Sequence, residues 1–165
     1  MLNTFTVCFF GHREIECTDM LEHNLDILLH NLIITKEYVE FLIGRNGEFD
    51  LLASSAIKRA IRRYSCGNTS LTLILPYINA DYRDNEQSYL DYYDNIEICE
   101  ESAEAHFKSA IQVRNRSMID RSDLGIFYAT HKGGAFHAMQ YALKQNKPII
   151  NLADSVQISP SVLNP

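Results

Sequence analysis

Several absences limit what this sequence can encode. No two of its four cysteines have the C-x-x-C spacing of zinc knuckles or redox motifs, and its six histidines show no metal-like grouping. No apolar run is long enough to span a membrane, and the first ten residues lack a secretory pattern. Basic residues do not predominate, because 15 Lys and Arg stand against 21 Asp and Glu. We therefore expect a cytoplasmic protein with no metal, no membrane partner and no nucleic-acid partner.

The common catalytic and nucleotide-binding signatures are also missing. The sequence has no G-x-x-x-x-G-K-[ST] and no G-x-G-x-x-G motif. No Ser or Cys stands in a nucleophile-elbow context. These absences give no support for an NTPase with a phosphate-binding loop, a dinucleotide-binding enzyme or a serine hydrolase.

What the 165 residues do contain is a regular alternation of apolar runs and helical patterns. The expected strands are 4–10, 38–43, 71–75, 95–99, 124–129 and 149–153. One expected helix begins near residue 18, and three others cover 48–64, 103–121 and 134–145. Such alternation predicts an α/β fold in three layers, with a mostly parallel sheet between two layers of helices. We expect one domain over 1–153 and a loosely ordered tail over 154–165.

Three of the expected strands end at glycine. Gly11 follows the first strand, Gly44 the second, and the pair Gly133-Gly134 lies between the fifth strand and a helix. A glycine turn that opens a helix can hold an anion, because backbone approaches the ligand and the first N–H groups of the helix lack partners. The alternative is a tight turn that merely needs glycine. If the three strands are neighbours, their turns form one pocket at the carboxyl edge of the sheet.

The helix expected over 103–121 carries a charged residue on its apolar stripe. Arg114 lies four residues from both Ala110 and Met118, and Asn115 also faces inward. An unpaired charge in a protein interior is very costly, so Arg114 needs a partner. The partner is either an internal acid, such as Asp120 or Asp123, or an anionic ligand.

Four more polar residues near the glycine turns are candidate ligand contacts. His12 and Arg13 follow the first strand, and Arg suits bidentate contact with phosphate. Asp50 could accept a ribose hydroxyl, or it could simply stabilise the first turn of its helix. Lys132 could contact a phosphate, or it could be a solvated loop charge.

An acidic, tyrosine-rich segment separates the third and fourth strands. Residues 79–104 hold nine acidic residues and one basic residue, Arg83. We expect residues 77–93 to form a long loop with a helical turn. The segment is either a solvated surface excursion or a contact surface for another protein.

Taken together, these motifs resemble those of the SLOG superfamily, the Rossmann-like group that contains the LOG phosphoribohydrolases and the DprA recombination mediators. The resemblance is closest to its YpsA-like branch and covers roughly residues 5–152. It is carried by residues 11–14 (GHRE), 47–53 (GEFDLLA), 114–120 (RNRSMID), 122–123 (SD) and 133–134 (GG).

The resemblance implies a Rossmann-like fold whose glycine turns hold a nucleotide or a nucleotide-derived ligand. Members are often dimers or larger, so self-association is expected by analogy. In LOG enzymes the turn reads GGxGT and a catalytic Glu follows it, with an Arg from the preceding helix. Arg114 matches that Arg, but residues 133–137 (GGAFH) have no third Gly, no Thr and no Glu close behind.

Three functions follow from these patterns. The first is the binding or sensing of a nucleotide-like ligand by Gly11, His12, Arg13, Gly44, Asp50, Arg114, Asn115, Lys132, Gly133 and Gly134, without a further cofactor. The second is cleavage of an N-glycosidic bond, with Arg114 and either Glu14 or Asp120 in place of the missing Glu. The third is a protein-interaction role for the acidic segment.

Overall fold

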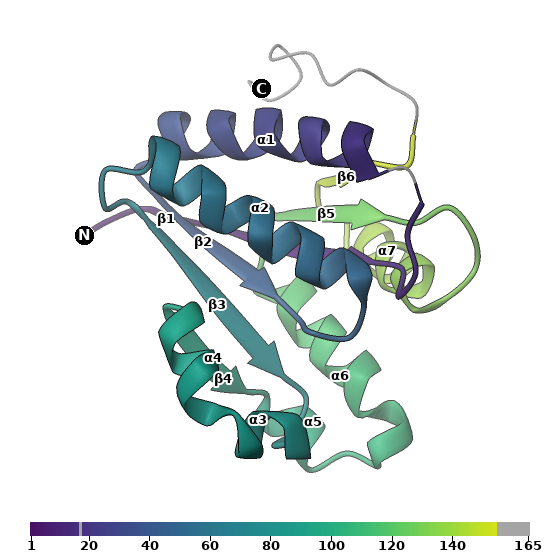
Figure 1. Cartoon of the computed structure of the whole chain (residues 1–165). Coiled ribbons are helices and arrows are strands. Elements are labelled where there is room, and N and C mark those ends of the chain that lie inside the picture. The colour runs from purple at the N-terminus through teal and green to yellow at the C-terminus, as the bar shows by residue number, and fades with distance from the viewer. Residues whose placement is uncertain (17, 155–165) are drawn as a thin grey trace.

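The computed structural model describes residues 1–16 and 18–154, and within them six strands form one sheet (Figure 1). The strands are β1 (Thr4–Gly11), β2 (Tyr38–Ile43), β3 (Thr69–Leu75), β4 (Asn95–Ile98), β5 (Leu124–Tyr128) and β6 (Ile149–Asn151). Their spatial order is β4-β3-β2-β1-β5-β6, and every neighbouring pair is parallel. The expected α/β fold is therefore confirmed, with a sheet that is parallel throughout.

Helices cover both faces of this sheet (Figure 1). They are α1 (Thr18–Thr35), α2 (Glu48–Tyr64), α3 (Ala80–Asp84), α4 (Glu86–Tyr92), α5 (Glu100–Ala103), α6 (Phe107–Asp120) and α7 (Gly134–Lys144). Helix α1 packs beside α2 on one face, and α6 packs beside α7 on the other. None of the helices in the described ranges is long and apolar enough to cross a membrane.

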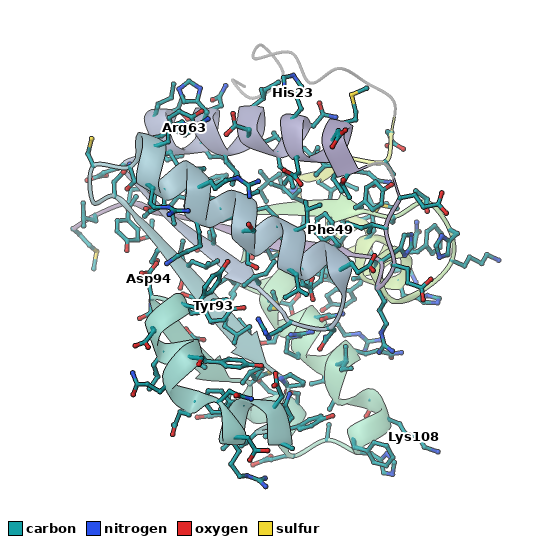
Figure 2. All side chains as sticks on the ribbon, in the orientation of Figure 1. His23, Phe49, Arg63, Tyr93, Asp94 and Lys108 are labelled. Atoms are coloured by element: carbon teal, nitrogen blue, oxygen red, sulfur yellow. The ribbon has the colours of Figure 1, made fainter. Side chains whose placement is uncertain are left out.

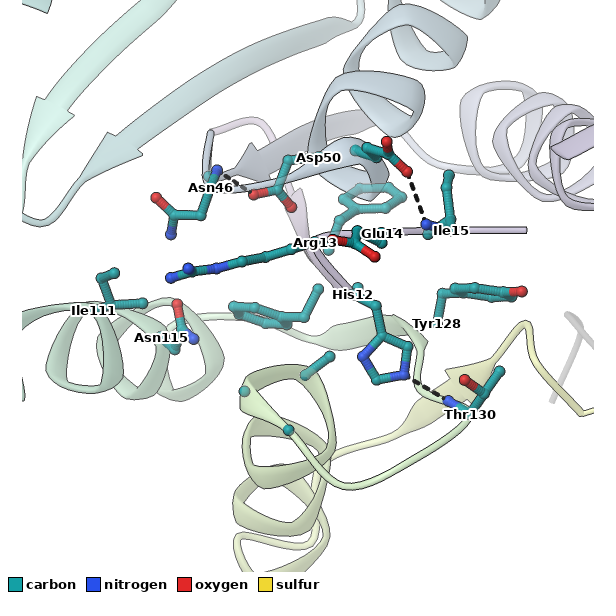
Figure 3. Close-up of a pocket in the computed structure, with 18 of the residues that line it drawn as sticks. His12, Arg13, Glu14, Ile15, Asn46, Asp50, Ile111, Asn115, Tyr128 and Thr130 are labelled. Carbon is teal, nitrogen blue, oxygen red and sulfur yellow. Dashed lines mark hydrogen bonds between the residues drawn. The ribbon is translucent and has the colours of Figure 1, made fainter. Parts of the chain in front are cut away.

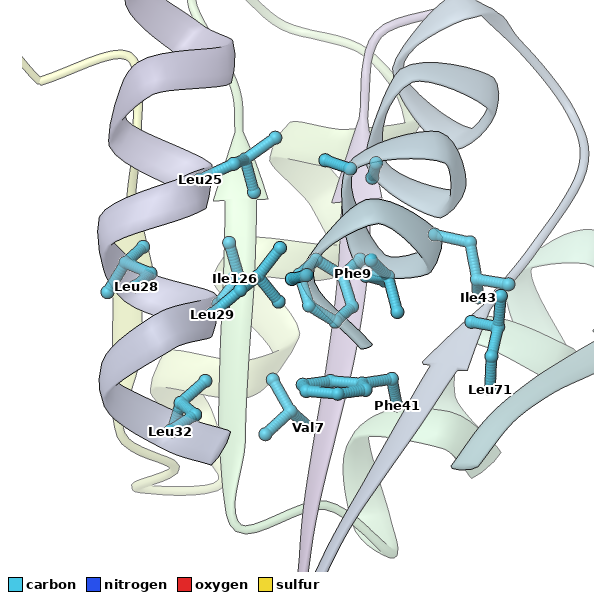
Figure 4. Packing of buried hydrophobic residues seen from close by; sticks show 14 of the residues in the cluster. Val7, Phe9, Leu25, Leu28, Leu29, Leu32, Phe41, Ile43, Leu71 and Ile126 are labelled. Atoms are coloured by element: carbon cyan, nitrogen blue, oxygen red, sulfur yellow. The ribbon is translucent and has the colours of Figure 1, made fainter. Parts of the chain in front are cut away.

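The apolar run of β1 supplies both hydrophobic cores, because successive side chains of a strand point to opposite faces. Val7 and Phe9 join the core beneath α1 and α2, whereas Cys8 and Phe10 join the core beneath α6 and α7. Figure 4 shows Leu25 and Leu29 of α1 packing over the sheet in the first of these cores. A strand covered on both faces must be apolar at consecutive positions, which is the pattern that the sequence shows.

The strand order creates a topological switch beside β1. The chain moves outward from β1 through β2 and β3 to β4, and then returns to place β5 on the other side of β1. Gly11 is in register with Tyr128, so the segments that follow β1 and β5 leave the sheet next to each other. Crevices in parallel α/β sheets lie at such points, outside the carboxyl ends of the strands.

The helix expected over 103–121 is divided in two. Helix α5 ends at Ala103, and α6 begins at Phe107 after His106, whose ring nitrogen accepts the N–H of Lys108 at 3.3 Å. Phe107 is 67% exposed, because it lies in the first turn of α6, beyond the edge of the core. Met118 and Ala110 are buried as the stripe predicts.

The long loop expected over 77–93 is also wrong, because α3 and α4 occupy most of it. Tyr89 and Tyr93 are buried and pack against the core beneath α2 (Figure 2). The guanidinium of Arg45 lies over the Tyr89 ring, and Lys58 of α2 donates to the carbonyl of Tyr92 at 2.8 Å. The tyrosines therefore serve as apolar anchors of this segment. The expected tail lies largely outside the described residues.

Candidate functional site

A cleft with a volume of ≈ 1070 Å³ opens at the topological switch (Figure 3). Its walls come from residues within four segments: 9–16, 44–50, 111–115 and 128–135. These are the ends of β1, β2 and β5 with the loops that follow them, together with one face of α6. All sequence candidates except Asp120 lie on these segments, and the fold brings the segments together.

The loop after β1 is fixed against the N-terminus of α2. The carbonyl oxygen of Arg13 accepts the N–H of Glu48 at 2.9 Å, and that of His12 accepts the N–H of Phe49 at 3.4 Å. In return, the carboxylate of Glu48 accepts the N–H of Ile15 at 2.8 Å. The N-terminus of α2 is therefore held by hydrogen bonds within the protein, and the N–H groups of Glu48 and Phe49 are not available to a ligand.

Gly11 and Gly44 have structural reasons to be glycine. A Cβ on Gly11 would lie 2.0 Å from Cγ of Phe49, and one on Gly44 would lie 2.6 Å from a terminal nitrogen of Arg114. Both residues line the cleft. Their lack of a side chain makes room for the protein's own residues, and access of a ligand to their backbone stays a prediction.

Gly133 and Gly134 are different. A Cβ on Gly134 would meet no described atom within 4 Å, and one on Gly133 would meet only Nδ1 of His12, at 3.9 Å. Neither residue has a positive φ that would favour glycine. Nothing in the protein's own packing therefore requires glycine here, and both residues border the open space of the cleft.

This glycine pair opens helix α7, whose N-terminus faces the cleft without a cap. Gly133 provides no side-chain hydrogen bond, and the N–H groups of Ala135 and Phe136 have no acceptor among the residues described. The first internal bond of the helix runs from the N–H of His137 to the carbonyl of Gly133 at 2.9 Å. Free N–H groups and the positive end of the helix dipole make this the most anion-receptive point of the cleft.

His12 lies beside this helix end. Its Nε2 accepts the N–H of Thr130 at 2.8 Å and that of His131 at 3.4 Å, and its ring stacks on the His131 ring at 3.8 Å. The residue is 7% exposed. Burial, followed by the charge of His131, lowers the pKa of His12, so its neutral form is favoured.

Arg114 occupies the floor of the cleft and is 2% exposed. One terminal nitrogen donates to the carbonyl of Ile74 at 2.6 Å, and Nε donates to the side-chain oxygen of Asn115 at 2.9 Å. It forms no ion pair with any carboxylate of residues 1–16 or 18–154. Burial lowers the pKa of Arg114, while the charge of Asp50 opposes that shift.

The two acids suggested as internal partners of Arg114 are engaged elsewhere. The carboxylate of Asp120 accepts the Tyr141 hydroxyl at 2.9 Å, and that of Asp123 accepts the N–H of Thr6 at 2.8 Å. Neither residue lines the cleft. The expectation that Asp120 could serve as a catalytic acid in this cleft is therefore wrong.

Asp50 is the buried acid of the cleft. One carboxylate oxygen accepts the N–H of Asn46 at 2.8 Å, and the residue is 8% exposed. Burial raises the pKa of Asp50, although the Asn46 N–H and the charge of Arg114 both act to lower it. Asp50 lies in the first turn of α2, as the helix-dipole role requires, but it also lines the cleft together with Arg114.

The remaining candidates differ in position. Figure 3 shows the Arg13 side chain extending across the cleft toward Ile111 and Asn115 of α6, and Glu14 also lines the cleft. Lys132 is exposed and is not among the lining residues, so the expected contact with a phosphate at that position has no geometric support.

Some lining residues were missed by sequence reasoning, namely Asn46, Glu48, Tyr128, Thr130 and His131. Asn46 and the Thr130-His131 pair lie inside the glycine-bearing turns, and that adjacency was the signal that could have found them. Among the described residues, no group of three or more His, Cys, Asp or Glu side chains could hold a metal ion.

A solved structure has a fold similar to that of this chain. A similar chain is in the X-ray structure of DNA processing protein A (DprA) from Streptococcus pneumoniae, with a TM-score of 0.63 and 15% sequence identity. The chain shares the fold of DprA. The match covers 88% of this chain and 49% of that one, so the chain spans about half the length of the DprA chain. At this level of identity the likeness shows a common fold.

No protein-family model matches the sequence, and no curated protein matches it.

Proposed function

We propose that the protein binds a nucleotide or a nucleotide-derived small molecule in this cleft, as a member of the YpsA-like branch of the SLOG superfamily. The uncapped N-terminus of α7 is the observation that carries the proposal. Its glycine pair leaves open space that the protein does not use, and its first N–H groups lack acceptors in the described structure. A phosphoryl group would satisfy both features at once.

The charged side chains of the cleft have both signs: Arg13 and Arg114 can meet an anionic group, and the four acids Glu14, Glu16, Glu48 and Asp50 can meet the hydroxyls of a polar remainder. Arg13 crosses the cleft toward Ile111 and Asn115, so its guanidinium can neutralise an anionic group that extends from α7 into the middle of the cleft. Asp50 and Asn115 lie toward the other side, where they can bond to the hydroxyls of a sugar or to a base. The volume of ≈ 1070 Å³ lies at the upper end of the range for small-molecule sites, about 300–1,000 Å³.

Thermal unfolding with added nucleotides tests the proposal. AMP, ADP-ribose or a cyclic dinucleotide at millimolar concentration should raise the melting temperature, because a ligand far above its dissociation constant stabilises the folded state. Gly134→Asp should abolish the shift by placing a carboxylate at the helix end. Gln140→Glu makes the same charge change near the middle of α7 and should preserve it. No shift of the wild type with any of these ligands would contradict the proposal.

Hydrolysis of an N-glycosidic bond is a second candidate function, and Asp50 is the observation that favours it. A buried carboxyl with a raised pKa in a cleft has the properties of a general acid or base. Incubation with nucleoside monophosphates should then release free base, and Asp50→Asn should stop the release. Binding without any release in the wild type would leave ligand binding as the function.

A further inference from the structure

The hydrogen bonds of His12 determine which of its ring nitrogens carries the proton. Nε2 faces two backbone N–H groups, those of Thr130 at 2.8 Å and His131 at 3.4 Å. A ring nitrogen that accepts hydrogen bonds is unprotonated, and in a neutral imidazole the proton then lies on the other nitrogen. The buried position of His12, beside the His131 ring, favours the neutral form. His12 is therefore an Nδ1–H tautomer.

The Nδ1–H group of His12 has no acceptor within the described part of the chain. Nδ1 lies 3.9 Å from the position that a Cβ on Gly133 would occupy, so it borders the space beside the glycine pair. Figure 3 shows the ring lying between the Thr130 contact and the cleft. Among the described residues, no buried side-chain nitrogen or oxygen lacks a partner, so Nδ1 is a donor that is open to the cleft. A ligand oxygen beside the glycine pair can therefore accept from it.

We propose that His12 donates its Nδ1–H to an oxygen of the ligand's anionic group, so that this group is held by donors alone: the imidazole N–H and the first N–H groups of α7. The inference rests on the proposed function and adds a specificity to it. A site with donors only favours an oxygen that carries no proton, such as a phosphodiester, pyrophosphate or fully ionised phosphate oxygen. It disfavours an amine or a hydroxyl donor at the same position.

Protonation of both ring nitrogens would conflict with this arrangement. A second proton on Nε2 would face the N–H of Thr130, and the bond that holds the loop after β5 would be lost. The titratable side chains against the ring are His131 and Tyr128, and Arg13, Glu14 and Glu48 line other parts of the same cleft. His12 therefore has two separable tasks: Nε2 orders the loop, and Nδ1–H meets the ligand.

Two substitutions separate these tasks. In His12→Gln the amide oxygen can take the place of Nε2 and accept from Thr130, but no donor remains at the Nδ1 position. In His12→Asn the amide NH₂ can take the place of Nδ1–H, but the acceptor for the loop is lost. We expect His12→Gln to keep the wild-type melting temperature and to bind AMP at least tenfold more weakly. We expect His12→Asn to melt at a lower temperature and to bind AMP more tightly than His12→Gln.

The experiment combines calorimetric titration of AMP with ¹⁵N NMR of the histidine rings of the free protein. The NMR spectrum should show His12 with its proton on Nδ1, and a proton on Nε2 would overturn the inference. Wild-type affinity in His12→Gln would also overturn it, since His12 would then only order the loop. Absence of binding by the wild type to AMP, ADP-ribose and a cyclic dinucleotide would instead overturn the proposed function, which is a separate result.

Discussion

The ring of Phe49 fills the space in which a side chain at residue 11 would lie. A Cβ added to Gly11 would come within 2.0 Å of Cγ and 2.4 Å of Cδ1 of Phe49, a residue that is completely buried. The contact joins the end of β1 to the start of α2, and the N–H of Phe49 is bonded to the carbonyl of His12. The shape of the cleft therefore depends on a close fit between a glycine and an aromatic ring.

We expect Gly11→Ala to lower the free energy of unfolding by about 1–3 kcal/mol, the usual cost of overpacking a well-packed core. Urea denaturation measures the change. In a Phe49→Gly background, which removes the Cβ at 2.5 Å as well as the ring, the added methyl group has room and should cost much less. An equal cost of Gly11→Ala in both backgrounds would show that Phe49 is not the reason for glycine at this position.

The glycine pair should behave in the opposite way. Gly134→Ala meets no neighbour and gains helix propensity, so the free energy of unfolding should stay the same or rise by up to about 1 kcal/mol. The methyl group would intrude on the open space at α7, so we expect the stabilisation by ADP-ribose to fall. Gly11→Ala is the comparison variant for both measurements, the free energy of unfolding and the stabilisation by ADP-ribose. A loss of stability in Gly134→Ala without a change in ligand response would contradict our view of this turn.

Asp123 and Asp120 form a matched pair of acids near the C-terminus of α6. The carboxylate of Asp123 accepts the N–H of the largely buried Thr6, whereas Asp120 is exposed and bonds to the Tyr141 hydroxyl. Asp123→Ala leaves a buried N–H group without a partner and should cost about 1–3 kcal/mol. Asp120→Ala should change the free energy of unfolding by no more than about 0.5 kcal/mol. Neither substitution should alter nucleotide binding, and an effect of Asp120→Ala on binding would restore it as a site residue.

Asp50 should make the stability of the protein depend on pH. Because burial raises the pKa of Asp50, the folded state binds more protons than the unfolded state above the unfolded pKa of about 3.9. Stability should therefore fall as pH rises from that value through the folded pKa. The loss is about 1.4 kcal/mol for each unit by which the folded pKa exceeds the unfolded pKa. Asp50→Asn mimics the protonated form, so it should equal the wild type near pH 3.5 and exceed it at pH 8.

The control for this pH dependence is Asp84→Asn, the same change at an exposed position of α3. It should leave the pH profile of unfolding as it is in the wild type. If Asp50→Asn were less stable than the wild type at pH 8, the ionised carboxylate would have to be favourable in the folded protein. That outcome would reverse the sign of the shift and make Asp50 a stabilising partner of Arg114.

The sheet was predictable because its pattern is local. A strand covered on both faces needs consecutive apolar residues, and the run Val7–Phe10 shows them directly. The break between α5 and α6 was not predictable, because residues 103–106 are compatible with a helix. The last turn of α5 is held by a long-range contact, from the Ser102 hydroxyl to the carbonyl of Pro76. The helices α3 and α4 were missed for a related reason, since their tyrosines are buried by tertiary packing that no sequence period reports.

The candidate site was predictable as a set of segments but not as a set of roles. Adjacency to strand ends identified Gly11, Gly44 and the pair Gly133-Gly134 equally. Only the structure shows that Phe49 and Arg114 fill the space beside Gly11 and Gly44, whereas the space beside the pair Gly133-Gly134 is open. The partners of Arg114 were likewise hidden, because one of them, the carbonyl of Ile74, lies 40 residues away and leaves no mark on composition.

The central claim is that the open end of α7 receives the anionic group of a nucleotide. The most direct measurement is a ¹H–¹⁵N NMR titration of the wild-type protein with AMP. We predict that the amide signals of Gly134, Ala135 and Phe136 shift most, saturate together and shift less in Gly134→Asp. Saturable binding that moves other amides and leaves these three unchanged, or no shift at millimolar AMP, ADP-ribose and cyclic dinucleotide, would contradict the account.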